Sequence, residues 1–184
     1  METLFTILWL FLPMGIANMG PVLAHNIPML RRFSYPLDFH KTFRGKRIFG
    51  DHKTIRGIVA GTVVGMLVAG LQYFVVSIFG IFESFTYTVD YSRPLVIFMG
   101  ACLGFGAMAG DAIKSYFKRQ VGIAPGKSWV PFDQLDFAVG ALVASLPFFR
   151  LPLSHYAIGI VVTLLLHPTI NVIAWLLRLQ ERPF

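Results

Sequence analysis

Charged residues are scarce in this chain. Only 14% of its 184 residues are Asp, Glu, Lys or Arg, whereas a soluble domain of this size normally carries about 25%. Apolar residues make up 55% of the chain and include 18 Phe. The shortage of charge therefore excludes an ordinary soluble domain and indicates a membrane protein.

Cysteine is almost missing as well. The single cysteine, Cys102, lies inside an apolar run, so no disulfide can form within the chain and no oxidising compartment is implied. The sequence also has no internal repeat and no polar linker that would separate two domains. We therefore expect one polytopic membrane domain over residues 1–184.

Long apolar stretches, in contrast, are abundant. A helix that crosses a bilayer core needs about 20 residues, and five stretches reach or approach this length: residues 4–30, 55–82, 94–119, 134–149 and 156–177. The first is not expected to be a signal peptide, because the chain opens METLF without a basic segment and the run contains polar and Pro residues. The sequence therefore predicts an all-α integral membrane protein with five transmembrane helices.

The net charge of +7 is distributed unevenly. Fourteen of the 16 Lys and Arg residues lie in residues 31–56, in residues 114–127 or at the carboxy terminus, and only Arg93 and Arg150 lie elsewhere. Because cytoplasmic loops carry an excess of Lys and Arg, we expect the amino terminus outside and the carboxy terminus in the cytoplasm. Two cytoplasmic loops then hold the functional residues, at the inner face of the cell membrane.

A polar segment, GDAIKSYFKRQVGI, ends the third apolar stretch. Four of its residues have the spacing i, i+3, i+4, i+7 and so share one helix face: Asp111, Lys114, Ser115 and Lys118. The lysines and Arg119 suit the carboxy-terminal end of a helix and could simply anchor it at the interface. A carboxylate inside a membrane helix needs a partner, however, so Asp111 is a candidate for a functional site.

The fourth apolar stretch opens with the sequence PFDQLD, which contains Asp133 and Asp136. Both carboxylates fall near the start of the expected helix, where capping is one role open to them. Together with Asp111 they would also form the set of oxygen ligands that Mg²⁺ prefers. The sequence leaves both interpretations open.

The basic segment FRGKRIFGDHKTIRG, residues 43–57, contains three glycines and five Lys or Arg residues. A polybasic segment beside a membrane commonly binds anionic lipid headgroups. Glycines interspersed with cations are also typical of a phosphate-binding loop, although the P-loop pattern GxxxxGK[ST] is not matched. We expect five residues here to bind phosphate oxygens: Lys46, Arg47, Lys53, Thr54 and Arg56.

Carboxylates for Mg²⁺ beside cations for oxyanions are the combination that phosphoryl and nucleotidyl transfer requires, because charge develops on phosphate oxygens. At the cytoplasmic interface a phosphate-bearing lipid can meet a soluble nucleotide. The sequence therefore predicts an Mg²⁺-dependent transferase that acts on a lipid phosphate. A CTP-dependent lipid kinase would need the same groups and stays open as an alternative.

A small non-enzymatic membrane transporter is a second alternative. Transporters place charge near the bilayer midplane, whereas here charge gathers at the cytoplasmic ends of the spans, which favours interfacial chemistry. Nucleic acid is not an expected partner, because the basic residues lie against the membrane. A homodimer is possible, since the glycine-rich third span could pack against a second copy.

The polar segments resemble the phosphatidate cytidylyltransferase superfamily, most closely its archaeal branch, the CDP-archaeol synthases. Eight residues fall on the superfamily pattern: Asp111, Ser115, Lys118, Arg119, Pro125, Gly126, Asp133 and Asp136. Lys53, Thr54 and Gly57 resemble a second family block, and Asn18 with Pro21 resembles the first-helix motif of the archaeal branch. The chain departs from the bacterial pattern at residues 127–129 and at Gln134.

The resemblance implies that CTP and digeranylgeranylglyceryl phosphate, an isoprenoid glycerol phosphate lipid, react to give CDP-archaeol and pyrophosphate with Mg²⁺ as cofactor. It implies metal ligands at Asp111, Asp133 and Asp136, and catalytic roles for Asp111, Lys118 and Asp133. Substrate-binding roles are expected for a longer set: Asn18, Lys46, Arg47, Lys53, Thr54, Arg56, Lys114, Ser115, Arg119, Pro125 and Gly126. A CDP-alcohol phosphotransferase is not indicated, because its conserved Gly and Arg do not follow Asp136.

Overall fold

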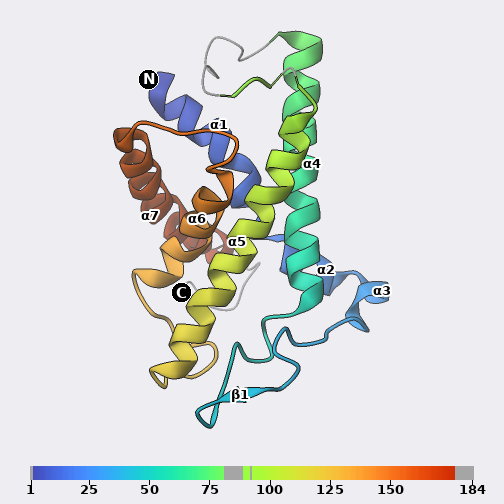
Figure 1. Cartoon of the computed structure of the whole chain (residues 1–184), viewed down its shortest axis with the longest axis vertical. Coiled ribbons are helices and arrows are strands. Elements are labelled where there is room, and N and C mark those ends of the chain that lie inside the picture. Colours follow the sequence, from blue (N-terminus) through green and yellow to red (C-terminus); the bar gives the residue numbers. More distant parts are fainter. Residues whose placement is uncertain (1, 81–88, 92, 177–184) are drawn as a thin grey trace.

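The computed structural model describes residues 2–80, 89–91 and 93–176 and is mostly helical, as predicted (Figure 1). Its helices are α1 (Glu2–Ala17), α2 (Gly20–Asn26), α3 (Pro28–Arg31), α4 (Ile55–Phe79), α5 (Leu95–Gln120), α6 (Phe132–Ser145) and α7 (Leu153–Leu176). Strands β1 (Thr42–Phe43) and β2 (Lys46–Arg47) pair as a short antiparallel hairpin between α3 and α4. Residues 81, 82 and 177 of the predicted spans lie outside the described residues.

Among the described residues, three helical segments are long and apolar enough to cross a membrane: Thr3–Asn26, Ile55–Phe79 and Leu95–Gln120. They coincide with the first three predicted spans. Helix α6 has 14 residues, fewer than the roughly 20 of a full span, whereas α7 has 24 and contains the apolar stretch Leu153–Leu166. The chain is thus a multi-pass membrane protein, and the count of five spans stays a prediction.

The first predicted span is not one continuous helix. Helix α1 ends at Ala17, α2 begins at Gly20 and α3 begins at Pro28. Pro lies in the first turn of both α2 and α3, where its missing N–H is not needed and its fixed φ suits a helix start. The break lets the chain approach α4 closely, because a Cβ at Gly20 would lie 2.7 Å from the Cα of Gly61.

Helix α5 lies between α4 and α6 and packs against both (Figure 1). Its glycines make these contacts close: Gly100 and Gly104 face α4, whereas Gly106 and Gly110 face α6. A Cβ at Gly110 would lie 2.1 Å from the backbone carbonyl oxygen of Asp136. These glycines therefore pack within the chain. The contact at Gly110 sets the distance between the carboxy-terminal part of α5 and the start of α6.

We expect Gly110→Ala to destabilise the protein by about 1–3 kcal/mol, because the added methyl group forces the backbones of α5 and α6 apart. The control is Gly70→Ala in α4, where a Cβ would meet no described atom within 4 Å. That variant should be neutral or more stable by up to about 1 kcal/mol, since Ala favours a helix over Gly. Unfolding of both variants in detergent measures the difference, and equal stabilities would contradict the packing argument.

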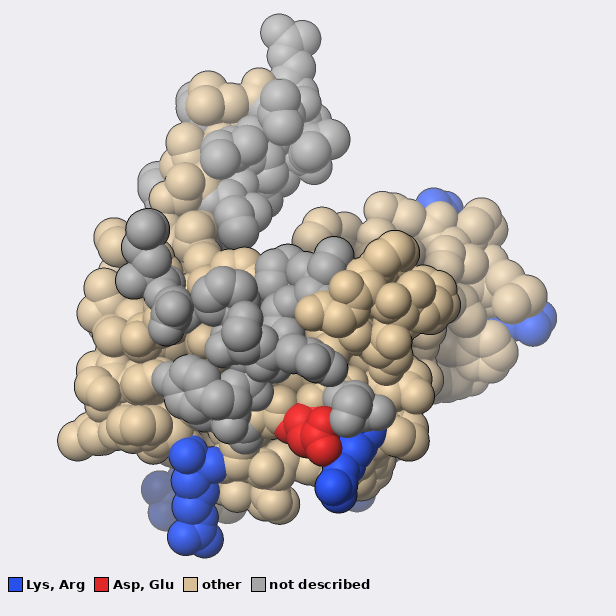
Figure 2. Space-filling view, turned by 90° about the horizontal axis from the view of Figure 1, so that it is seen from above, with Lys and Arg blue, Asp and Glu red and all other residues tan. Residues whose placement is uncertain are grey.

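Charge is concentrated at the end of the bundle that carries the hairpin. Seen from the opposite end, the described surface is largely uncharged and shows Lys and Arg toward its edge, with an acidic patch beside one of these basic groups (Figure 2). One side of α4 exposes large apolar side chains at helical spacing, namely Leu67, Leu71, Phe74 and Ile78. Such a surface suits contact with lipid chains rather than water. The fold therefore preserves the charge asymmetry noted in the sequence.

Candidate active site

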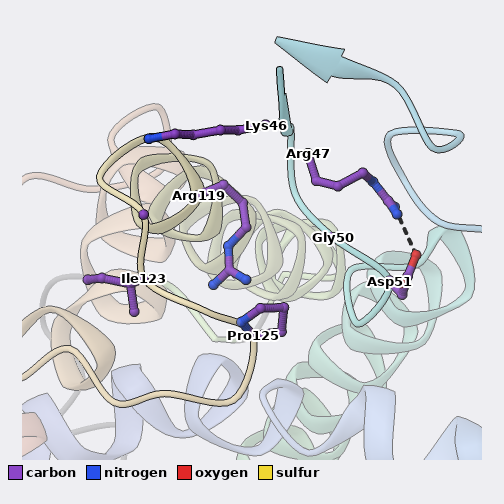
Figure 3. A pocket seen from close by; sticks show the side chains of 8 residues that line it. Lys46, Arg47, Gly50, Asp51, Arg119, Ile123 and Pro125 are labelled. Carbon is purple, nitrogen blue, oxygen red and sulfur yellow. Dashed lines mark ion pairs between the residues drawn. The ribbon is translucent and has the colours of Figure 1, made fainter. Parts of the chain in front are cut away.

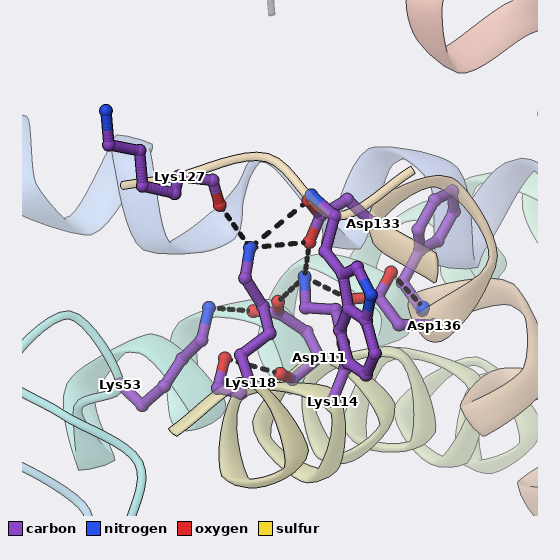
Figure 4. A network of polar contacts seen from close by, with 10 residues as sticks. Lys53, Asp111, Lys114, Lys118, Lys127, Asp133 and Asp136 are labelled. Carbon is purple, nitrogen blue, oxygen red and sulfur yellow. Dashed lines mark hydrogen bonds and ion pairs between the residues drawn. The ribbon is translucent and has the colours of Figure 1, made fainter. Parts of the chain in front are cut away.

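Six charged residues from three parts of the chain meet near the hairpin end of the bundle (Figure 4). We refer to them as the carboxylate–lysine cluster: Lys53, Asp111, Lys114, Lys118, Asp133 and Asp136. Lys53 directly precedes the N-cap of α4, three members lie on α5, and two lie near the start of α6. Three carboxylates thus face three ammonium groups, so the cluster is formally neutral.

Lys114 lies at the centre of the cluster. Its Nζ atom is 3.0 Å from Oδ1 of Asp111, 2.8 Å from Oδ1 of Asp133 and 2.6 Å from Oδ2 of Asp136. The side chains of Lys114 and Asp136 are only 13% and 5% exposed. Because a buried charge is costly unless it is paired, one ammonium group stabilises all three carboxylates.

The other two lysines of the cluster each contact one of its carboxylates. Lys53 forms an ion pair with Asp111, which joins the segment before α4 to α5. Nζ of Lys118 lies 3.1 Å from Oδ1 of Asp133 and also donates to the backbone carbonyl of Lys127. The loop between α5 and α6 is therefore folded back onto the cluster.

A pocket of about 300 Å³ lies between this loop and the segment that contains the hairpin (Figure 3). Its lining includes three cations, Lys46, Arg47 and Arg119, and the predicted Pro125. Figure 3 shows Arg119 extending toward Ile123 and Pro125. Nε of Arg119 is buried and has no hydrogen-bond partner among the described residues. Arg119 is therefore a cation of this pocket whose guanidinium is not fully paired within the described part of the chain.

Lys46 and Arg47 already have partners at the pocket. Nζ of Lys46 donates to the backbone carbonyl of Gln120 at 2.6 Å, which joins the two loops. Nη2 of Arg47 lies 2.9 Å from Oδ1 of Asp51. Gly126, which directly follows the pocket residue Pro125, has a φ of +77°, a conformation that glycine adopts without strain.

Three other predicted substrate-binding residues use their side chains for local contacts in the fold, and a fourth lies at a break between helices. Oγ1 of Thr54 accepts the backbone N–H three residues later and caps α4. Oγ of Ser115 donates at 2.9 Å to the backbone carbonyl four residues earlier. Arg56 donates to the carbonyl of Leu30 at 3.1 Å and so ties α3 to α4. Asn18 lies at the break between α1 and α2. The structure does not bring these four side chains into the cluster.

Asp38 holds a position that no motif of the sequence indicates. Its buried carboxylate accepts hydrogen bonds from Nη2 of Arg47 at 2.8 Å and from the backbone N–H groups of His40, Phe49 and Gly50 at 3.1, 2.9 and 3.0 Å. Burial by itself would raise the pKa of Asp38, but Arg47 and these amides outweigh it and hold the pKa well below its usual range. The available signal in the sequence was one acidic residue within the otherwise basic residues 31–47.

The cluster can be tested for its fit to a divalent metal. In the part of the chain that the structure describes, no group of three His, Cys, Asp or Glu residues has the arrangement of a ready metal centre. The chemistry of the donors nevertheless fits, because three carboxylates share one cation, Nζ of Lys114, and carboxylate oxygens are ligands that Mg²⁺ prefers. A metal would compete with Lys114 for the same oxygens.

Comparison with known proteins identifies the family. The family model described as CarS-like, CDP-archaeol synthase, matches residues 1–184. The chain belongs to the CDP-archaeol synthase family. This confirms the resemblance predicted from the polar segments of α5 and α6.

Two relatives in the CDP-archaeol synthase family illustrate the match. The CDP-archaeol synthase of Pyrococcus furiosus is 32% identical over 185 residues, which cover 100% of both chains. That of Archaeoglobus fulgidus is 37% identical over 191 residues, which cover 100% of this chain and 99% of the relative. A solved structure described as an intramembrane enzyme for archaeal membrane lipids biosynthesis is 29% identical, with a TM-score of 0.71 over 90% of this chain and 92% of that one.

Proposed function

We propose that this protein is a CTP:lipid-phosphate cytidylyltransferase, which makes CDP-archaeol and pyrophosphate from CTP and digeranylgeranylglyceryl phosphate. The observation that carries the proposal is the carboxylate–lysine cluster beside a cationic pocket at one end of a membrane-spanning bundle. Membership of the CDP-archaeol synthase family supports the same activity. The combination of carboxylates and cations meets the electrostatic needs of nucleotidyl transfer.

The proposed topology has five spans in one domain, with the amino terminus outside and the carboxy terminus in the cytoplasm. The concentration of Lys and Arg at one end supports it. The cluster then lies at the cytoplasmic face of the cell membrane, at the depth of lipid headgroups. There a lipid phosphate in the inner leaflet and a nucleotide in the cytosol can reach the same side chains.

The cationic side chains bind the phosphate groups in this proposal. Arg119 and Lys46 at the pocket would bind the nucleotide triphosphate, whereas Lys53, Lys114 and Lys118 of the cluster would bind the phosphates that react. These lysines are held in place by the carboxylates with which they pair. Cations fixed before the reaction stabilise the charge that develops on phosphate oxygens without having to reorganise.

In the reaction, an oxygen of the lipid phosphate attacks the α-phosphorus of CTP. A new P–O bond forms, the bond from the α-phosphorus to the oxygen that bridges it to the β-phosphorus breaks, and pyrophosphate leaves with that electron pair. The lipid phosphate is already an anion at neutral pH, so the attack needs no general base. The residues of this chain have the tasks of orienting the two phosphates and offsetting their mutual repulsion.

We propose Mg²⁺ as the cofactor, held by Asp111, Asp133 and Asp136. When bound, it would supply positive charge to the nucleotide phosphate oxygens and so make the α-phosphorus more electrophilic. The carboxylates of α5 and α6 support this assignment because they already converge on one cation. Their positions depend on the close contact between these helices at Gly110.

A label-transfer assay tests the activity. The purified protein in detergent is given Mg²⁺, an isoprenoid glycerol phosphate and CTP labelled at either the α- or the γ-phosphate. We expect the lipid product to take up label only from the α position, with release of pyrophosphate. Label from the γ position would show a CTP-dependent lipid kinase instead, and no transfer from either position would favour the non-enzymatic transporter.

A further inference from the structure

We propose that Asp38 is a positioning residue for nucleotide binding: it holds Arg47 and the backbone of Phe49 and Gly50 so that residues 38–51 form one wall of the cationic pocket. The inference rests on the proposed function, in which this pocket receives the phosphates of CTP. It assigns a role to a carboxylate that takes no part in the carboxylate–lysine cluster.

The contacts of Asp38 close the segment into a loop. Its side chain is completely buried, and its two oxygens accept from the side chain of Arg47 and from the backbone of residues on both sides of the hairpin. The turn of the hairpin has positive φ at Arg44 and Gly45, and Gly50 has a φ of +92°. The backbone has bonds of its own here, such as those from the N–H of Lys41 to the carbonyl of Asp38 and from the N–H of Ile48 to the carbonyl of Lys41, and the carboxylate adds the bonds that tie the segment before the hairpin to the segment after it.

Electrostatic repulsion makes such an anchor necessary. The segment carries Lys41, Arg44, Lys46 and Arg47 close together, and like charges held near one another destabilise a compact loop. Arg47 is neutralised on two sides, at 2.8 Å by Asp38 and at 2.9 Å by Asp51. Arg47 therefore acts mainly through the loop that it stabilises, while Lys46 and Arg119 are left to meet an anion.

The position of Lys53 is fixed by different bonds. Its backbone carbonyl accepts from the N–H of Leu37 at 2.7 Å, and the N–H of Ile55 donates to the carbonyl of Tyr35 at 3.1 Å. Neither of these two bonds involves the side chain of Asp38, and among the described residues only one further bond, from the N–H of Lys53 to the carbonyl of Gly50 at 3.2 Å, joins Lys53 to the loop that Asp38 holds. Loss of that carboxylate should therefore disturb the pocket wall and leave the ion pair between Lys53 and Asp111 in the cluster. The depressed pKa of Asp38 also keeps the anchor charged throughout the pH range of an enzyme assay.

The test compares steady-state kinetics and direct CTP binding in wild type and Asp38→Asn. We expect the KM for CTP and the Kd of CTP, measured by calorimetry, to rise by about tenfold or more, because bonds between a buried carboxylate and charged or amide donors are lost. The kcat at saturating CTP and the KM for the lipid phosphate should stay within about twofold of wild type, since the cluster is retained. A merely structural role would instead lower the amount of active protein and leave both KM values unchanged.

Two further variants sharpen the test. Asp90→Asn, which removes an exposed carboxylate 2.7 Å from Arg93 on the opposite side of the protein, should behave as wild type. Arg47→Met should by itself raise the KM for CTP. In the double variant Asp38→Asn with Arg47→Met, the increase in KM should be smaller than the product of the two single increases, because both changes remove the same contact. If Asp38→Asn fails to fold, Arg47→Met alone carries the same test.

The outcomes separate this inference from the proposed function. A wild-type KM and Kd for CTP in both Asp38→Asn and Arg47→Met would overturn the role of Asp38, as would a fall in kcat with no change in either constant. If wild type binds CTP but transfers no α-label to lipid, the proposed function fails. The ratio of CTP affinities in wild type and variant would then still decide whether Asp38 orders the pocket.

Discussion

Replacing Asp133 by Asn is expected to lower the rate of cytidylyl transfer by about a thousandfold, which is typical when one preorganised electrostatic group is removed from an active site. The carboxylate of Asp133 contacts both Lys114 and Lys118, so its loss releases two cations and removes one proposed Mg²⁺ ligand. Asn has the same shape and leaves α6 and its contact with α5 intact. The initial rate of transfer from α-labelled CTP measures the effect.

A folded and inactive variant is the informative result for Asp133→Asn. Its elution from a size-exclusion column in detergent should match that of wild type, and its unfolding temperature should fall without loss of the fold, because Lys118 loses its carboxylate partner while Lys114 keeps two. Asp90→Asn is the matched control and should retain full activity, since Asp90 pairs with Arg93 away from the cluster. Activity of Asp133→Asn within tenfold of wild type would remove Asp133 from the proposed metal site.

The second large effect is expected for Lys114→Met. Met has a similar length but no charge, so the variant leaves three converging carboxylates without the cation that they share. We expect kcat/KM to fall by at least about a hundredfold, as for the loss of a preorganised charge. We also expect the affinity for a divalent cation without nucleotide to rise by about tenfold or more, because the competing ammonium group is gone and the carboxylates repel one another.

Binding of Mn²⁺ followed by electron paramagnetic resonance measures the second effect without any turnover. The control is Lys127→Met, because the side chain of Lys127 is exposed and points away from the cluster in Figure 4. This variant should bind Mn²⁺ and turn over substrate within about twofold of wild type, as surface substitutions usually do. Equal Mn²⁺ affinity in Lys114→Met and wild type would show that Lys114 does not compete for the metal ligands.

The two substitutions should change the affinity for Mn²⁺ in opposite directions, and this difference separates the role of Asp133 from that of Lys114. Asp133→Asn removes a donor and should weaken Mn²⁺ binding, whereas Lys114→Met removes a competitor and should strengthen it. General misfolding of the cluster would weaken binding in both variants. The pair of measurements therefore tests whether the carboxylates are metal ligands or only partners of the lysines.

The sequence was sufficient for features that depend on neighbours along the chain. The spans that became α4 and α5 were predicted within a few residues, because unbroken apolar runs decide membrane helices. The common helix face of Asp111, Lys114 and Lys118 followed from the spacing of the residues alone. The polar segments of α5 and α6 also indicated the family, since its motifs are contiguous in the sequence.

The choice between alternatives for single residues needed the fold. The sequence left open whether Lys114 only anchors a helix, and the structure gives it three carboxylate partners. The capping role considered for Asp133 is not what the structure shows, because α6 has no side-chain cap and the carboxylate accepts the N–H of Trp129, which precedes the helix. It also pairs with two lysines, so capping does not account for its position.

The tertiary structure alone decided the contacts between distant segments. Lys53 and Asp111 are 58 positions apart and meet because the start of α4 lies beside the end of α5. The approach of α6 to Lys114 depends on Gly110, where a Cβ would collide with the neighbouring backbone. The role of Asp38 depends on donors from both sides of the hairpin. Hydrophobic periodicity is a property of neighbouring residues and determines where the helices form. The site depends on the distances between the backbones of different helices, and only the packing of the helices sets these distances.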